Sequence, residues 1–126
     1  MKIILTGRII SKKNSRNIFF KNNKQVNIPS PAYKRFQLDA GYQLLKYKKP
    51  MLSTNLRIDY VFYFKGNMGA DGDNLQASVN DILQNFGIIQ DDRLIKEWTG
   101  KIVAGCPDWK TEIVIEEIGK ERRWLL

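Results

Sequence analysis

Histidine is absent from this chain of 126 residues and cysteine occurs once, and these two shortages exclude several kinds of site. Without histidine the chain cannot form a Ser-His-Asp triad, a Cys-His catalytic pair or a His-ligated zinc site. The lone Cys106 cannot form an intrachain disulfide or a multi-thiolate zinc site. Any catalytic chemistry must therefore use carboxylates, amines, hydroxyls or a metal ion.

Long apolar runs are also missing. The apolar run at residues 3–5 is short, soon interrupted by Arg8, and followed by no small-residue cleavage site. No stretch approaches the roughly 20 apolar residues that a membrane span needs, so we expect a cytoplasmic protein without a membrane partner. Length and a 43% apolar composition predict one folded domain with its own core.

Charge is distributed very unevenly along the chain. Residues 1–49 contain twelve Lys and Arg but a single acid, Asp39, whereas residues 71–92 contain five Asp and no basic residue. Neighbouring carboxylates repel one another unless cations arrive from elsewhere, either the chain's own lysines or a metal ion. A solvated acidic helix face is the alternative. A basic field around a compact acidic segment suits a metal-dependent enzyme that acts on a polyanion.

Periodicity and turn residues predict an α+β fold, a single domain with a mixed β-sheet and two main helices. The predicted order is a strand at 2–10, a hairpin from 18–20 and 25–28, a helix at 31–47 started by Ser30 and Pro31, a strand at 56–65, a loop at 66–72, a helix from Asp73 to a stop at Gly87, and strands at 96–103 and 111–118. The second helix should bury Leu75, Val79, Ile82, Leu83 and Phe86. We expect the domain to span residues 1–118, followed by a charged tail at 119–126.

Two pairs of aspartates flank the second predicted helix. Asp71 and Asp73 are spaced i and i+2, so in an extended segment they would point to one side and could share a divalent cation. Asp91 and Asp92 follow the helix and can approach the first pair only if the next segment returns beside the long strand. Each pair also has a purely structural interpretation: Asp73 as a helix cap, Asp71 in a turn, and Asp91 with Asp92 as a surface pair.

The combined motif is more specific than either pair. Asp71-Gly-Asp73-Asn-Leu, then Asn80-Asp81-Ile-Leu, then Gly87-Ile-Ile-Gln-Asp91-Asp92 resembles the RusA-type Holliday-junction resolvases, as do Ser11-Lys-Lys-Asn14 and the residues that open the first helix. The likeness covers most of residues 5–118 and includes a resemblance to forms of the family common in phages and prophages.

This resemblance implies a homodimeric endodeoxyribonuclease that makes paired symmetric nicks in four-way DNA junctions with Mg²⁺ or Mn²⁺. Asp71, Asp73 and Asp92 match the family's catalytic, metal-binding acids, and Asp91 is expected to join them at the metal. Asp81 is expected to be structural or to lie near the site. The residues expected to bind DNA are Lys12, Lys13, Asn14, Arg16, Lys21, Lys24 and Lys101; the hairpin among them could instead be an ordinary one with a solvated outer side.

One departure from the family matters. Its members often carry a catalytic lysine four residues after the second Asp, and here that position is Ala77. Lys96 or Lys101 could replace this amine, or activity could be weak or lost. The alternative function is therefore a non-catalytic or weakly active junction-binding relative. A basic structural protein of a virion would explain the charge but not the acidic segment.

Overall fold

The computed structural model describes residues 1–11, 16–21, 24–47, 50–66 and 72–119. Its elements are β1 (Lys2–Thr6), β2 (Arg16–Lys21), β3 (Lys24–Pro29), α1 (Pro31–Leu44), a 3-10 turn η1 (Leu45–Tyr47), β4 (Asn55–Lys65), α2 (Gly72–Asn85), a 3-10 turn η2 (Asp92–Leu94), β5 (Ile95–Cys106) and β6 (Lys110–Gly119). This is the α+β single domain, with a mixed sheet and two main helices, that the sequence predicts.

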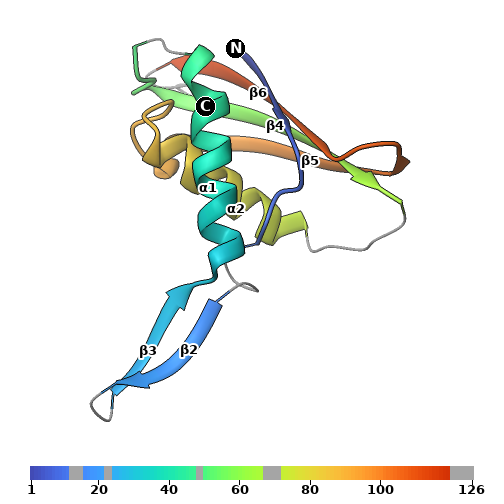
Figure 1. The fold of residues 1–126 in the computed structure, drawn as a ribbon. Coiled ribbons are helices and arrows are strands. Elements are labelled where there is room, and N and C mark those ends of the chain that lie inside the picture. The colour runs from blue at the N-terminus through green and yellow to red at the C-terminus, as the bar shows by residue number, and fades with distance from the viewer. Residues whose placement is uncertain (12–15, 22–23, 48–49, 67–71, 120–126) are drawn as a thin grey trace.

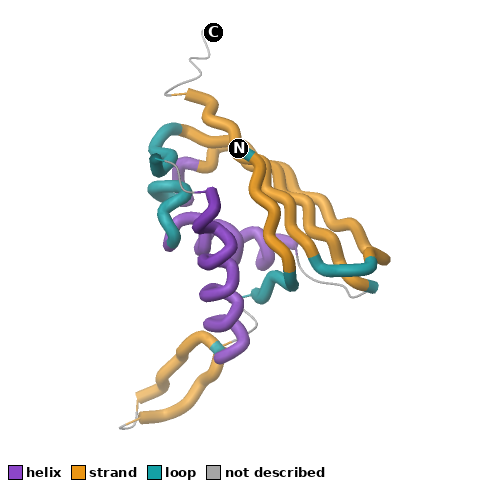
Figure 2. Tube along the Cα trace, turned by 45° about the horizontal axis from the view of Figure 1, so that its top comes forward, coloured by secondary structure: helices purple, strands orange, loops and turns teal. Residues whose placement is uncertain are grey.

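The main sheet has four strands in the order β1-β6-β4-β5. Strand β6 pairs antiparallel with both β1 and β4, whereas β4 and β5 are parallel and connected through α2. Both helices cover one face of this sheet and leave the other face uncovered (Figure 2). The chain after α2 does return beside the long strand, but Asp92 precedes β5 and therefore lies near the start of β4, whereas the first Asp pair follows the end of β4.

The core lies between this sheet and the helices. Every second residue of β4 is at most 4% exposed, namely Leu56, Ile58, Tyr60, Phe62 and Phe64. Helix α2 buries the predicted residues Leu75, Val79, Ile82 and Leu83 against them. Because side chains alternate along a strand, the intervening residues of β4 point to the uncovered face of the sheet.

Helix α1 starts where the sequence indicates. The Ser30 Oγ accepts a hydrogen bond from the Tyr33 backbone N–H at 3.2 Å, and Pro31 occupies the first helical position. Gln43 ties this helix to β1, since its Oε1 accepts from the Thr6 N–H at 2.8 Å and its Nε2 donates to the Thr6 carbonyl at 3.0 Å. The helix thereby fixes the edge of the sheet at β1.

Several predicted boundaries and one predicted burial differ from the structure, among them the end of α1 at Leu44 instead of residue 47 and the extension of β5 to Cys106. Strand β1 ends at Thr6, not at residue 10, because Gly7 takes a φ of +97° and donates its N–H to the Trp109 carbonyl. The hairpin strands β2 and β3 are longer than predicted, and α2 begins at Gly72, so Asp73 lies inside its first turn. Phe86, predicted to be buried, is 44% exposed.

The hairpin β2–β3 projects from the start of α1, away from the four-stranded sheet (Figure 1). Its pairing register runs from Arg16 opposite Pro29 to Lys21 opposite Lys24. Strand β6 extends to Gly119, one residue past the predicted domain end, and residues 120–126 lie outside the described ranges. Neither α1 nor α2 is long and apolar enough to cross a membrane, and no other helix in the described ranges is.

Candidate active site

Tyr60 is a residue of β4 that lies beneath α2 and bonds to polar side chains of that helix. It occupies the middle of β4, is 1% exposed, and donates its hydroxyl hydrogen to Asn80 Oδ1. A hydrogen bond also links this hydroxyl with Gln76. Burial raises the pKa of Tyr60 above its ordinary value of 10.0, the hydrogen bonds with Asn80 and Gln76 oppose that rise, and the negative charge of Asp92 adds to it. The hydroxyl is therefore a neutral donor at pH 7, in the electrostatic range of Asp92.

Polar side chains form a row along α2. Gln76, Asn80 and Gln84 are spaced four residues apart, so they lie on one face of the helix, and Asp73 holds the position three residues before Gln76. At the far end, Gln84 Oε1 accepts a hydrogen bond from the Asp92 backbone N–H at 3.0 Å. The row therefore leads from the helix's first turn to the start of η2.

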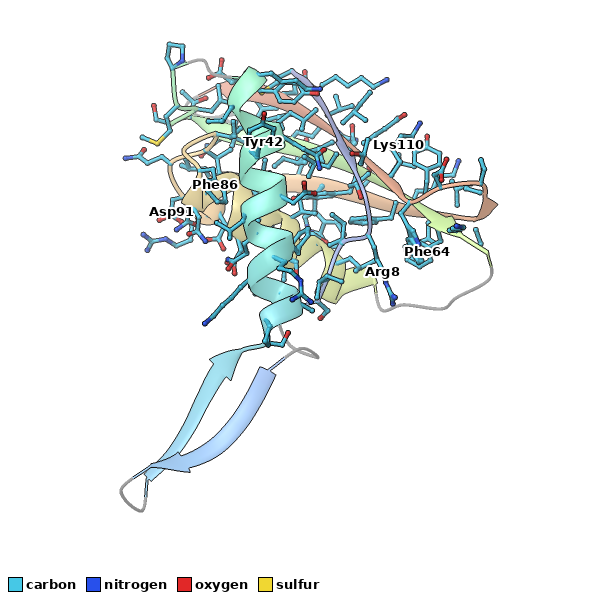
Figure 3. The ribbon with its side chains drawn as sticks, viewed as in Figure 1. Arg8, Tyr42, Phe64, Phe86, Asp91 and Lys110 are labelled. Atoms are coloured by element: carbon cyan, nitrogen blue, oxygen red, sulfur yellow. The ribbon has the colours of Figure 1, made fainter. Side chains whose placement is uncertain are left out.

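Asp91 and Asp92 have different roles at η2. Asp91 caps this 3-10 turn: its Oδ1 accepts from the Arg93 N–H at 2.8 Å, and its Oδ2 meets Arg93 Nη2 at 2.8 Å. These contacts with Arg93 lower the pKa of Asp91 to about 2. Asp92 is exposed, and its charge is the one that acts on Tyr60. In Figure 3, Asp91 lies on the opposite side of the molecule from Phe64, which marks the end of β4.

The predicted metal ligands come from two ends of α2. Asp71 and the side chain of Asp73 lie outside what the structure describes, and among the described residues no three His, Cys, Asp or Glu side chains are grouped to hold a metal ion. Because Asp73 is helical, the expectation of an extended Asp71–Asp73 segment is wrong at that residue. A helix rises about 1.5 Å per residue, so about 16 Å of helix axis separates Asp73 from Gln84. The negative charge of Asp92 contributes to the raised pKa of Tyr60, which lies in the middle of β4.

Asp81 faces a different neighbour. Its Oδ2 accepts a hydrogen bond from the Tyr33 hydroxyl of α1 at 3.3 Å. This contact joins the two helices, which fits the structural role expected for Asp81.

The basic residues divide into three groups. Lys12, Lys13 and Asn14 lie outside the described ranges, whereas Arg16, Lys21 and Lys24 lie on the projecting hairpin β2–β3. Lys101 of β5 is exposed and pairs in register with Val61, a residue that points to the uncovered face of the sheet. Lys101 therefore faces away from α2 and is not placed to replace a lysine at position 77. Lys96, which is exposed, is closer to Asp92 along the chain.

Sequence reasoning did not identify the polar row or Tyr60. The signal for the row is the four-residue spacing of Gln76, Asn80 and Gln84 beside the apolar stripe of the same helix. The signal for Tyr60 is a hydroxyl-bearing residue at an inward position of an otherwise apolar strand, since a buried Tyr usually finds a hydrogen-bond partner.

Comparison with known families supports the likeness seen in the motifs. The family model described as Endodeoxyribonuclease RusA matches residues 9–116, which is most of the chain. No individual curated protein matches the chain significantly.

Proposed function

This chain belongs to the RusA family of endodeoxyribonucleases, and on that premise we propose that it resolves four-way DNA junctions by metal-dependent phosphodiester hydrolysis. A DNA-cleaving family accounts for the uneven charge of the chain, since lysines and arginines hold phosphates while carboxylates hold a divalent cation. The proposal also specifies a metal ion, the residues that bind it, selectivity for four-way junctions and a homodimer.

We assign the metal to Asp71, Asp73 and Asp92, with Mg²⁺ or Mn²⁺ as the ion. Because about 16 Å of helix axis separates Asp73 from Gln84, which binds the Asp92 backbone, Asp92 would join the other two carboxylates across a symmetric dimer. Carboxylate oxygens are the hard ligands that these ions prefer. A bound ion of this kind supplies neutralisation of phosphate charge and a water of lowered pKa. Asp91, the fourth expected ligand, already has its carboxylate engaged by Arg93, so it fits better as the residue that holds η2 in place.

The chain's own residues position this site. The Tyr60 hydroxyl holds Asn80, and Gln84 holds the Asp92 backbone, so strand β4 and helix α2 together fix the start of η2. The observation that carries the proposal is this polar row, which begins one turn after Asp73 and ends at Asp92. The basic residues Lys12, Lys13, Asn14, Arg16, Lys21, Lys24 and Lys101 would contact the DNA backbone.

Paired symmetric nicks require two active sites. We therefore propose a homodimer with twofold symmetry, because each of two equivalent sites would then face one of two equivalent strands.

Aspartate-to-asparagine variants test the assignment. Asp73→Asn and Asp92→Asn each remove one charged ligand while keeping the side chain's size, so we expect at least a 100-fold slower nicking of four-way junctions in Mg²⁺. Binding of the same junction in EDTA should remain within about threefold of wild type. The measurement is a single-turnover cleavage assay beside a linear duplex of equal length.

Asp108→Asn is the matched control, since it makes the same chemical change at an exposed residue between β5 and β6. It should cleave like wild type. Wild-type rates in either Asp73→Asn or Asp92→Asn would exclude that residue as a ligand and would refute the proposed metal site.

A second candidate function rests on Ala77. This residue is exposed on α2 at the position where the family often carries a lysine, so a relative that grips junctions without cutting them is the alternative. Calorimetric titration with Mn²⁺ separates the two, because a pure binding protein need not retain a carboxylate metal site.

A further inference from the structure

Strand β5 presents an exposed aromatic side chain at the edge of the main sheet. In the strand order β1-β6-β4-β5, β5 is an outer strand (Figure 1). Trp98 is 50% exposed and Ile102 is 42% exposed on this strand. Two large apolar side chains at an open sheet edge require an explanation, since they would otherwise favour association.

Both side chains lie on the sheet face that α2 covers. Trp98 pairs in register with Ile58 and Ile102 with Phe62, which are buried residues of that face. Gly100 lies between them and pairs with Tyr60. The Trp98 ring lies over Gly100, because a Cβ at Gly100 would be 3.7 Å from the Trp98 Cζ3 atom. The indole therefore lies against β5 beside Gly100, the residue that pairs with Tyr60.

The charges near Trp98 favour an anionic partner. Lys96, two residues before Trp98 on the same strand, is exposed. The neighbouring acid, Glu97, pairs in register with Arg57, so it lies on the opposite face of the sheet from Trp98, and it meets Arg57 Nη1 at 3.4 Å, which offsets its charge. An exposed indole beside a lysine is suited to single-stranded or unstacked DNA, in which a phosphate meets the amine and a base meets the ring.

We propose that Trp98 stacks on an unstacked nucleobase at the branch point of the DNA substrate and thereby positions the strand beside Asp92. This inference rests on the proposed function, since it takes branched DNA as the ligand. Bases inside a continuous duplex are already stacked on their neighbours, whereas a branch point offers base faces that an indole can cover. Trp98 is then a positioning residue that discriminates branched from linear DNA.

The experiment measures equilibrium binding in EDTA, where no cleavage occurs, to a synthetic four-way junction and to a linear duplex of the same length. Trp98→Ala should bind the junction about 10-fold or more weakly than wild type, given the usual strength of base–aromatic stacking. Its affinity for the duplex should change less than about twofold. Trp98→Phe should recover most of the junction affinity, because phenylalanine keeps an aromatic face.

Tyr42→Ala is the matched control, because Tyr42 is an aromatic residue of α1 that is 76% exposed (Figure 3). It should leave both affinities unchanged. Equal junction binding by Trp98→Ala and wild type would overturn the inference, as would Trp98→Phe binding as weakly as Trp98→Ala. Sedimentation of each variant completes the test, since a loss of junction binding explained by a changed oligomeric state would make Trp98 an interface residue and also overturn it. A wild-type protein with no preference for the junction would instead refute the proposed function.

Discussion

The Tyr60 hydroxyl is the residue-scale feature that most clearly joins the core to the candidate site. It is buried in β4 yet bonded to Asn80 on the polar face of α2 and subject to the charge of Asp92. Tyr60→Phe should lower the free energy of unfolding at pH 7 by about 1 kcal/mol, because one hydrogen bond is lost and Asn80 loses its donor. Urea denaturation measures this change.

The pH dependence of the same variant carries a second signature. The folded-state pKa of Tyr60 is raised, so above pH 10 the unfolded chain loses this proton first and binds fewer protons than the folded chain. Wild-type stability should therefore be level with respect to this group below about pH 10 and should fall above it. Tyr60→Phe should lack that part of the fall. Tyr42→Phe, a change at an exposed residue, should retain it; equal alkaline slopes for Tyr60→Phe and wild type would contradict the assignment.

At the scale of elements, the approach of α1 to α2 depends on Gly41. A Cβ at this position would be 2.4 Å from Cζ of Phe86, so the ring occupies the space that a side chain would need. This contact also explains why Phe86 is half exposed although the helical spacing predicts burial: it rests against a backbone surface of α1 at the margin of the core.

A double-mutant cycle tests this helix contact. Alanine is favoured over glycine inside a helix by about 1 kcal/mol, so Gly41→Ala should stabilise the Phe86→Ala background by about that amount. In the wild-type background the displaced ring should cancel the gain, giving a coupling of about 1 kcal/mol or more. Chemical denaturation of the four proteins measures it, and additive effects would show that Phe86 does not depend on Gly41 for its position.

At the scale of the whole molecule, positive charge is concentrated in the first part of the chain, and we expect it to mediate binding to DNA. Charge reversal of Lys12 and Lys13 together should make the plot of log K against log salt concentration shallower by about 2, since each lost phosphate contact removes about 0.9 from the slope. Junction binding between 50 and 200 mM salt, concentrations over which such contacts weaken strongly, is the measurement.

A control with the same net charge separates local contact from overall attraction. Lys2→Glu with Lys46→Glu reverses two exposed lysines elsewhere on the domain. It should leave the slope close to that of wild type. If both double variants make the salt dependence of binding shallower by the same amount, Lys12 and Lys13 act through net charge alone and are not phosphate contacts.

Local physics allowed the sequence to predict most elements. The cap formed by Ser30, the strand at 56–65 and the apolar spacing in α2 all depend on residues a few positions apart; the structure confirms the cap, the strand and the burial of Leu75, Val79, Ile82 and Leu83, but not that of Phe86. The α+β class follows from the order of these elements. The acidic motif likewise pointed to the family to which the chain belongs.

The tertiary structure alone decided what lies beside what. The end of β1 at Thr6 depends on a hydrogen bond between Gly7 and the distant Trp109, and the position of Asp92 depends on Gln84 and on the parallel pairing of β5 with β4. The placement of Lys101 on the uncovered face and of Trp98 beside Ile58 follows from strand register. Periodicity fixes which face of an element is apolar, whereas pairing and register between distant segments depend on contacts that no local pattern encodes.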